Sequence, residues 1–502
     1  MRNVLEFLEN VVQHNGNKTA VEDIGNRITY AELYQRARKA GSFLHSYVKI
    51  GDPIAVYAEK SVNTIVCMLG IVYAGAFYSV VDVKHPKERV KSILDTLDAK
   101  VILVEEKKKQ RFKDMGIDIT VLSIEEVLEG NIDEKVLSEI RANVIDTDPL
   151  YANFTSGSTG IPKGVVVSHR SVIDFIQYFT QLCGITSKDV IGNQAPLDFD
   201  VSVKDIYSAL LTGATVELIP PIYFSFPNKL MEFLAERKVT TLIWAVSALC
   251  IVTTLRALEL CRPKFLNKIM FSGEMMPIKH LNIWRKYYPQ AVFINLYGPT
   301  EITCNCSYYI VDREFAGGEI LPIGKPFPNE RILLLDENDQ LITEEEQEGE
   351  ICVIGTALAL GYYNSQSVTS QNFVQNPLHN RYPELMYRTG DMGKYHNKEL
   401  YFVGRKDFQI KLMGHRIELN EIEAVIALAE GVDRVCCVFE EEKIWAFLKG
   451  NAEVENGLRK VMQEKLPKYM WPSELIWVDE MPLNKNGKID RKLMMQQYRT
   501  TH

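Results

Sequence analysis

The sequence predicts an α/β protein with a large N-terminal body of layered α/β subdomains and a small α+β C-terminal domain. Two observations predict this. Amphipathic helical stretches alternate with short β-branched runs along most of the chain, and a compact second run of helix and strand patterns begins near Asp407. The 502 residues suffice for a large core and for more than one domain. We therefore expect domains over residues 1–406 and 407–502.

The first elements of the body follow from hydrophobic periodicity. Residues 1–17 mix apolar side chains with Glu6 and Glu9, which favours an amphipathic helix over a secretion signal. The apolar stretch 64–83 contains Gly70 and Asp82, so it predicts a buried helix followed by a strand and not a membrane span. Further patterns predict a helix at 30–48 and strands at 53–57, 100–104 and 118–122.

The end of the body and the small domain are also predicted by pattern. A glycine-containing turn is expected at 388–392, followed by a strand pair around Lys394 and Tyr401. The small domain is expected to contain helices at 420–428 and 455–466 and strands at 432–439 and 443–448.

Composition excludes several classes of function. Hydrophobic residues make up 46% and charged residues 24%, as in an ordinary globular protein. The formal net charge is -8, so no overall basic field favours nucleic acid or an anionic membrane. The nine cysteines are scattered without a Cys-x-x-Cys pair, which predicts reduced thiols and no structural metal. A cytoplasmic enzyme is the expected class.

The most informative segment is the run at 155–164, Thr-Ser-Gly-Ser-Thr-Gly-Ile-Pro-Lys-Gly. Its glycines permit tight turns, its hydroxyls and amides can donate to phosphate oxygens, and Lys163 adds a positive charge. The spacing is not that of a Walker loop. The apolar run at 165–167 puts the segment at a strand end, where α/β sheets bind ligands. By itself the segment could also be an ordinary surface loop.

This run resembles the phosphate loop of the adenylate-forming superfamily, which includes acyl-CoA synthetases, luciferases and the adenylation domains of nonribosomal peptide synthetases. Four further segments match that family in the expected order, and the resemblance extends from about Leu5 to Lys492. The segments are Asn-Leu-Tyr-Gly-Pro-Thr-Glu at 295–301, Tyr-Arg-Thr-Gly-Asp at 387–391, Gly-Arg-Lys-Asp-Phe-Gln-Ile-Lys at 404–411 and Pro-Leu-Asn-Lys-Asn-Gly-Lys-Ile-Asp at 482–490.

The resemblance implies that a carboxylate attacks the α-phosphorus of ATP. Two anions meet in that step, so the site must supply positive charge and fixed donors. Lys488 matches the catalytic lysine, Glu301 matches the Mg²⁺ ligand, and Asp407 falls at a hinge about which the small domain rotates between two half-reactions. The residues implied at the ATP phosphates are Thr155, Ser156, Gly157, Ser158, Thr159, Gly160, Lys163 and Thr300.

A second group of residues matches those that bind the nucleoside of ATP in this family. The resemblance implies that Tyr297 stacks on adenine, that Asp391 accepts hydrogen bonds from the ribose hydroxyls, and that Arg405 lies nearby. Tyr297 could otherwise be a core aromatic, and Glu301 an acid at a helix start. The residues implied at adenine and ribose are Gly273, Glu274, Asn295, Tyr297, Gly298, Asp391 and Arg405.

The segment at 195–202 resembles the version of this family that recognises amino acids. Asp200 would pair with the α-ammonium of the substrate, a role for which acyl-CoA synthetases have no need. The implied substrate-binding residues are Phe199, Asp200, Val201, Lys204, Ala248, Met270, Ser272, Leu296, Cys304 and Asn305.

Lys204 allows three interpretations. It follows Asp200 by four positions, so on a helix the two would share a face and could form an ion pair. Lys204 could instead bind a second carboxylate of the substrate, such as that of glutamate or aspartate. It could also weaken the attraction of Asp200 for an ammonium, so that a β-amino or non-amino acid binds.

The chain contains no carrier domain of its own, so we expect a separate carrier protein with a phosphopantetheine thiol as partner. Free-standing enzymes of this size resemble D-alanine–D-alanyl carrier protein ligases, which makes D-alanine a candidate substrate. Ser272 and Lys204 depart from that pattern, which has cysteine and an apolar residue there. The alternatives are an acyl- or aryl-CoA ligase that uses free coenzyme A, and a nucleotide-binding scaffold without activity.

Overall fold

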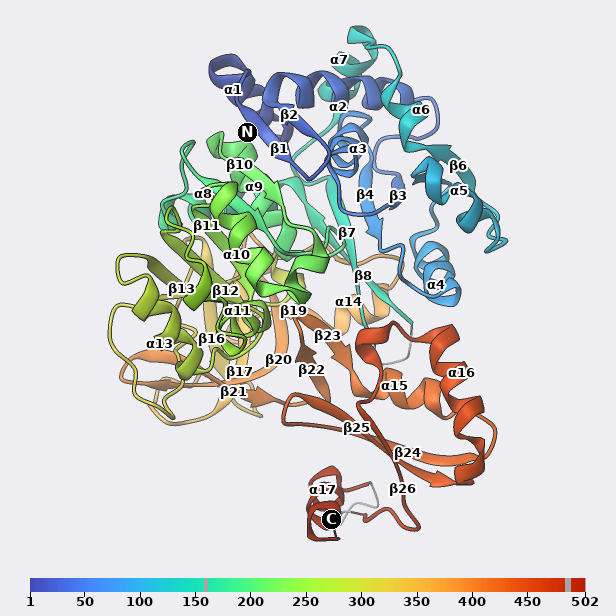
Figure 1. Ribbon diagram of the computed structural model, residues 1–502, viewed down its shortest axis with the longest axis vertical. Helices are drawn as coiled ribbons and strands as arrows, with labels where there is room; N and C mark the ends of the chain where they lie inside the picture. Colours follow the sequence, from blue (N-terminus) through green and yellow to red (C-terminus); the bar gives the residue numbers. More distant parts are fainter. Residues whose placement is uncertain (158–160, 484–488, 502) are drawn as a thin grey trace. The chain divides into compact units, whose positions relative to one another are not determined.

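The computed structural model describes residues 1–157, 161–483 and 489–501, and it separates the chain into two compact units. The first unit contains residues 1–83, 97–154 and 164–406. The second contains residues 84–96, 155–163 and 407–502, so two short segments from the N-terminal half belong to it. Each unit has its own core. Figure 1 labels their helices and strands along the chain.

A nine-stranded sheet forms the larger part of the first unit, in the order β15-β14-β13-β12-β11-β9-β10-β1-β2. Strands β9 to β13 are parallel to one another, whereas β14 and β15 continue the sheet in antiparallel pairing. The strands are β1 Thr19–Glu22, β2 Arg27–Thr29, β9 Val190–Asn193, β10 Thr215–Leu218, β11 Thr241–Ala245, β12 Lys268–Ser272, β13 Val292–Tyr297, β14 Ser307–Ile310 and β15 Lys325–Pro326.

Helices cover both faces of this sheet, as side-chain alternation along the strands requires. Ile243 and Met270 lie in the core cluster that also holds residues of α8 and α9, whereas Trp244 and Phe271 lie in a cluster with α10, α11 and α13. The helices are α1 Leu5–Asn15, α8 His169–Cys183, α9 Val201–Thr212, α10 Pro227–Glu236, α11 Val246–Thr254, α12 Ala257–Leu260 and α13 Ile278–Tyr287, with the 3₁₀ turn η1 Pro221–Ser225.

A second, seven-stranded sheet has the order β18-β8-β7-β4-β3-β5-β6 and is parallel from β7 to β6. Helices α2 and α3 pack closely where Gly70 faces Ala40. A Cβ at Gly70 would lie only 2.5 Å from the Cβ of Ala40. The elements are α2 Tyr30–Leu44, β3 Pro53–Tyr57, α3 Val62–Tyr73, β4 Phe77–Val81, β5 Val101–Val104, α5 Glu106–Lys113, β6 Thr120–Ser123, α6 Ile124–Leu128, α7 Glu134–Asn143, β7 Pro149–Thr155, β8 Lys163–Ser168 and β18 Gly361–Tyr362.

A third sheet of antiparallel strands completes the first unit, in the order β16-β17-β20-β19, and β21 also pairs with β20. Its elements are β16 Glu330–Leu335, β17 Gly349–Gly355, α14 Gln366–Asn372, β19 Phe373–Gln375, β20 Leu385–His396 and β21 Glu399–Arg405.

The second unit has a three-stranded sheet with helices on both faces. Neighbouring residues of β24 point to opposite faces, so Cys437 packs with α15 and α16 while Cys436 packs with α17. The elements are α4 Lys87–Leu97, β22 Gln409–Leu412, β23 His415–Glu418, α15 Leu419–Ile426, β24 Val432–Glu440, β25 Lys443–Gly450, η3 Ala452–Val454, α16 Glu455–Lys465, η4 Lys468–Met470, β26 Glu474–Trp477 and α17 Arg491–Thr501.

The mixed α/β class is confirmed, and so is the expected strand at 53–57. The helix expected at 30–48 is present but ends at Leu44, and the strand expected at 432–439 continues to Glu440. Within the described residues, no helix is long and apolar enough to span a membrane. The expected turn at 388–392 is wrong. Strand β20 runs through it, because Gly390, at φ 72°, accommodates an irregular register between β17 and β20 without ending the strand.

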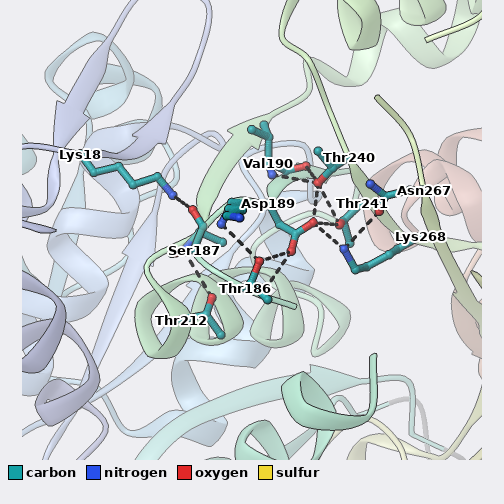
Figure 2. A network of polar contacts seen from close by, with 12 residues as sticks. Lys18, Thr186, Ser187, Asp189, Val190, Thr212, Thr240, Thr241, Asn267 and Lys268 are labelled. Atoms are coloured by element: carbon teal, nitrogen blue, oxygen red, sulfur yellow. Dashed lines mark hydrogen bonds and ion pairs between the residues drawn. The ribbon is translucent and has the colours of Figure 1, made fainter. Parts of the chain in front are cut away.

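A polar network fixes the amino ends of β9, β11 and β12 (Figure 2). Asp189 accepts hydrogen bonds from Lys268 Nζ at 2.8 Å and from the hydroxyls of Thr240 and Thr241 at 2.7 and 3.1 Å. Burial would raise the pKa of Asp189, but these donors and the Thr186 amide lower it below its ordinary value. The network leaves the opposite, carboxyl ends of the strands available for a site.

Candidate active site

The carboxyl ends of β9 and β11 mark the place where the strand order of the large sheet reverses. Strand β9 is followed in sequence by β10 on one side, and the chain then returns to form β11 on the other side. Open α/β sheets bind ligands outside the carboxyl ends of strands at such a point. Helix α9 begins here, with Asp200 as its N-cap residue. Lys60 lies over the same end of β9, with Nζ 3.1 Å from the carbonyl oxygen of Asn193.

Tyr297, Asp391 and Arg405 come together in the first unit. The hydroxyl of Tyr297, at the end of β13, donates to Asp391 Oδ2 at 2.6 Å. Arg405 Nη1 donates to the other oxygen, Oδ1, and the two residues are directly opposite in the β20–β21 pair. Asp391 is buried, with 2% of its surface exposed. Three residues implied at adenine and ribose therefore form one cluster.

Electrostatics keep this cluster in a defined protonation state. Burial raises the pKa of Tyr297 well above its ordinary value, and the neighbouring Asp391 raises it further. The phenol therefore remains a neutral donor at any physiological pH, while Arg405 supplies the positive charge that faces the carboxylate. The ring of Tyr297 lies 6.4 Å from that of Phe402, between centroids.

Glu301 is enclosed by protein atoms. It belongs to the 3₁₀ turn η2, Thr300–Ile302, and is fully buried. Its Oε1 accepts a hydrogen bond from the Tyr362 hydroxyl at 2.7 Å, and its carbonyl oxygen accepts from the Ala359 amide at 2.8 Å. The described residues contain no group of three or more His, Cys, Asp or Glu side chains that could hold a metal. One hard carboxylate suits Mg²⁺ where phosphates and water supply the other ligands.

The turn after η2 is strained. Thr303 and Cys304 both have left-handed backbones, at φ 49° and 73°. A Cβ on Gly298 would lie 2.5 Å from the Cα of Asn305, so the turn packs directly on the Gly298 backbone. Cys304 Sγ donates to the carbonyl oxygen of Asp200 at 2.9 Å. The strained turn thus brings two implied substrate residues against the start of α9.

Lys204 lies on α9 and is fully buried. Its Nζ donates to Asn305 Oδ1 at 2.7 Å and to Ser272 Oγ at 3.4 Å. Of the three interpretations of Lys204, the structure does not support the ion pair with Asp200. No carboxylate of the described residues lies within 4.0 Å of Nζ, because the ammonium is turned toward the end of β12 and the strained turn.

The other implied residues of the first unit have varied surroundings. Met270 and Leu296 are fully packed in the core, and Ala248 is buried on α11. Phe199 and Val201 are partly exposed at the start of α9. Two of the residues implied at adenine form hydrogen bonds with the backbone of neighbouring segments: Asn295 Nδ2 donates to the Pro322 carbonyl at 2.8 Å, and Glu274 Oε2 accepts from the Ser247 amide at 3.1 Å. Gly273 has a left-handed backbone, at φ 97°.

The loop between β7 and β8 carries the implied phosphate-binding residues, and its described part belongs to the second unit. Ser156 Oγ donates to the Arg416 carbonyl at 2.7 Å. The Gly157 amide donates to Glu421, a buried acid that also pairs with Arg89 at 2.7 Å. Burial raises the pKa of Glu421, and Arg89 lowers it in part. The described residues do not include Ser158, Thr159, Gly160 and Lys488. The expected hinge residue, Asp407, accepts a hydrogen bond at Oδ1 from the Gln409 amide at 3.2 Å.

Several contributors were not identified from the sequence. Tyr362 holds Glu301, Thr389 Oγ1 accepts from the Asp391 amide at 3.0 Å, and Lys60 contacts the end of β9. Thr389 is in a matched motif and could have been found by its position beside Asp391. Tyr362 and Lys60 stand in no motif, and only the fold brings them to the site.

Comparison with known proteins identifies relatives over the whole chain. The model of a family described as AMP-binding enzyme matches residues 8–363, and that of the AMP-binding enzyme C-terminal domain matches residues 421–488. Zwittermicin A synthase ZmaJ of Bacillus cereus is 31% identical over 507 residues, which cover 98% of this chain and 94% of that protein.

Two larger relatives show the same similarity. Bacitracin synthase 1 of Bacillus licheniformis is 32% identical over 99% of this chain, and Tyrocidine synthase 1 of Brevibacillus parabrevis is 30% identical over 98%. The chain spans only 9% and 45% of these two proteins.

Solved structures confirm the fold. The adenylation domain AlmE of Vibrio cholerae, solved in complex with glycyl-adenosine-5'-phosphate, has a TM-score of 0.85 at 22% identity and covers 99% of this chain and 98% of that one. IdnL1 has a TM-score of 0.82 at 26% identity and covers 96% of this chain and 99% of that one.

Proposed function

Because the chain belongs to the AMP-binding enzyme family, within the adenylate-forming superfamily, we propose that it activates an amino acid with ATP. The products of this step are an aminoacyl-adenylate and pyrophosphate. The aminoacyl group then passes to the phosphopantetheine thiol of a separate carrier protein, and AMP is released. The observation that carries the proposal is the convergence of Tyr297, Asp391 and Arg405 from three matched motifs.

The chemistry follows from the charges. A carboxylate oxygen of the substrate attacks the α-phosphorus, and the bond to the pyrophosphate oxygen breaks. Lys163 and Lys488 supply positive charge where the two anions meet. Glu301 would hold Mg²⁺ with the phosphates, and the cation would neutralise charge on the leaving pyrophosphate. The amides and hydroxyls of residues 155–160, with Thr300, are proposed to orient the phosphates.

The nucleoside is proposed to lie at the Tyr297 cluster. The Tyr297 ring offers a stacking surface for adenine, and Asp391 can accept the ribose hydroxyls because its carboxylate is fixed from the other side by Arg405. Gly273, Glu274, Asn295 and Gly298 surround the ends of β12 and β13 and complete the proposed nucleoside site.

The substrate is proposed to be an amino acid, either D-alanine or another small or acidic one. Asp200 begins α9 at the sheet reversal and is proposed to pair with the α-ammonium. The similarity to Bacitracin synthase 1 and Tyrocidine synthase 1, and to a solved NRPS protein that contains adenylation and PCP domains, supports this reading over a CoA ligase. The similarity to o-succinylbenzoate CoA synthetase, at 20% identity, shows a common fold alone.

The second half-reaction is proposed to use Asp407 as a hinge, with residues 1–406 and 407–502 as the moving domains. In this proposal Lys488 serves adenylation only, and the segment that begins at Lys411 then serves transfer to the carrier thiol. We place both steps in the cytoplasm.

Pyrophosphate–ATP exchange tests the proposal. Purified protein with Mg²⁺ should exchange labelled pyrophosphate into ATP only when a suitable amino acid is present. The panel contains D- and L-alanine, glycine, β-alanine, glutamate, aspartate and several aryl and fatty acids. Exchange with no amino acid in a panel extended to all proteinogenic residues would contradict the proposal, and exchange with aryl or fatty acids alone would favour a CoA ligase.

A further inference from the structure

The starting point is a buried cation with only neutral partners. Lys204 is 0% exposed, and its Nζ contacts the side-chain oxygens of Asn305 and Ser272. Among the residues that the structure describes, Lys204 forms no ion pair. Lysine is rarely fully buried unless it is paired, because removing an ammonium from water is costly.

The two oxygens do not satisfy the ammonium. A lysine has three N–H donors, and only the contact to Asn305, at 2.7 Å, has the length of a strong hydrogen bond. The contact to Ser272, at 3.4 Å, is long. The ammonium therefore has donor capacity for a further acceptor, and an anionic one would also supply the missing charge.

The neighbouring acid Asp205 is not that acceptor. Adjacent residues on a helix point about 100° apart, and Asp205 Oδ2 is instead held by Asn193 Nδ2 at 2.6 Å. Burial raises the pKa of Asp205 to about 7, so its own negative charge is only partly present at neutral pH. The nearby Lys204 lowers the pKa of Asp205 in part, but the atoms that accept hydrogen bonds from Nζ are both neutral.

The position of the ammonium points to the substrate. Ser272 ends β12, Asn305 belongs to the strained turn, and Lys204 stands in the first turns of α9, one turn after Asp200. These three elements meet at the carboxyl edge of the large sheet, where the proposed function puts the amino acid. An amino acid bound through its ammonium to Asp200 would direct its side chain along this helix end.

We infer that the substrate is an amino acid whose side chain ends in a carboxylate, and that Lys204 Nζ, oriented by Asn305 and Ser272, is the partner of that carboxylate. The inference rests on the proposed function and narrows it. A small neutral substrate such as alanine would leave the buried Lys204 ammonium with only neutral hydrogen-bond partners.

Substrate selectivity of the unaltered protein tests this first. Exchange is measured with glutamate and aspartate, in both stereoisomers, beside their amides glutamine and asparagine and beside methionine, alanine, glycine and β-alanine. The best acidic amino acid should exceed its own amide by about 100-fold or more in kcat/KM, since the amide would leave a buried charge unpaired. Equal or better exchange with any neutral amino acid would overturn the inference and leave the proposed function standing. No exchange with any amino acid would overturn both.

The substitution Lys204→Met then assigns the selectivity to this side chain. Methionine has similar length without charge, so the preference for the acid over its amide should fall by about 100-fold, with retained exchange for the amide. Lys268→Met is the matched control, because it removes a lysine from the opposite end of the same strand, β12, that Ser272 ends. It should change stability and leave the acid-to-amide ratio unchanged. An unchanged ratio in a folded Lys204→Met variant would contradict the inference.

Discussion

Tyr297 donates a hydrogen bond of 2.6 Å to Asp391, which connects the end of β13 in the large parallel sheet to β20 in the antiparallel sheet. The two residues are 94 positions apart in sequence. Since Arg405 holds the other oxygen of Asp391, the carboxylate has one fixed orientation. A ligand that contacts this carboxylate meets an acceptor that is already oriented. Binding is favoured because the side chain loses little conformational entropy when the ligand binds.

The first prediction concerns this carboxylate. Asp391→Ala should lower kcat/KM for ATP by about 100-fold or more, mainly through a higher KM, because it removes the buried carboxylate that is proposed to accept the ribose hydroxyls. Tyr297→Phe keeps the ring and removes only the hydroxyl, so its loss should stay below about 10-fold. ATP titrations in the exchange assay measure both variants. A larger loss for Tyr297→Phe than for Asp391→Ala would contradict the assignment.

The second prediction concerns Gly298. A methyl group there would lie 2.5 Å from the Asn305 Cα and 2.8 Å from the Cys306 amide nitrogen, both backbone atoms that cannot rotate away. Gly298→Ala should therefore displace the strained turn, cost about 1–3 kcal/mol of stability and raise KM for the amino acid. Gly317→Ala is the control, because a Cβ at Gly317 meets nothing within 4 Å. Thermal unfolding and exchange kinetics should separate the two variants, and equal behaviour would refute the packing argument.

The third prediction concerns the network of Figure 2. Lys268→Met leaves the buried Asp189 without its cation, so it should cost roughly 1–3 kcal/mol near pH 7. The folded state lowers the pKa of Asp189, so its contribution is present above the unfolded value of about 3.9 and is lost as the pH falls through the lower, folded value. The difference from the unaltered protein should therefore shrink on acidification toward pH 3. A difference that is independent of pH would show that Asp189 is not involved.

The fourth prediction concerns Glu330. Its Oε1 accepts from the Ala357 amide at 2.9 Å, and its Oε2 is buried without a hydrogen-bond partner among the described residues. Burial raises the pKa of Glu330 to about 8, so between its unfolded pKa, about 4.3, and pH 8 the folded state holds a proton that the unfolded state has lost. Raising the pH through that window therefore lowers the free energy of unfolding through this group.

Glu330→Gln removes this titration and keeps the shape of the side chain. The variant should gain stability relative to the unaltered protein on going from pH 5 to pH 8. Melting temperatures measured at both values check this, and a gain that is larger at pH 5 would contradict it.

The fifth prediction concerns catalysis. Lys488→Ala should abolish amino-acid-dependent exchange, by about 1000-fold or more, because it removes the charge proposed to bridge carboxylate and phosphate. Lys485→Ala, three positions earlier in the same motif, should retain most of the activity. Circular dichroism shows whether both variants are folded. Near-normal exchange by the Lys488 variant would make its assignment wrong.

Much of the fold could be predicted because local patterns and tertiary structure agree. Helix α2 begins where Thr29 and Glu32 form a capping box, and the run 53–57 is fully buried on β3 as its β-branched composition indicates. Strand β20 was not predicted as continuous, because Gly390 is a local signal for a turn. There the pairing of β20 with both β17 and β21 overrides the local preference.

The site was predictable where a motif contains the chemistry and unpredictable where the fold brings residues together. Asp391 and Arg405 stand in matched segments, so their proximity could be expected in advance. The contact between Lys204 and Asn305 spans 101 positions, and nothing in the local sequence of Lys204 indicates which way its ammonium turns. Arg89 and Glu421, 332 positions apart, could not be paired from sequence at all.

The ends of the segment that carries Lys488 are joined by backbone hydrogen bonding in the small domain. Leu483 and Ile489 form an antiparallel bridge, and the Asp490 amide donates to the Pro482 carbonyl at 2.8 Å. Closing a loop of this length from an open chain would cost about 1.7 kcal/mol in chain entropy. Folding of the domain already meets that cost. The two ends of the segment 484–488 are therefore held together by the fold of the small domain itself, before any ligand binds.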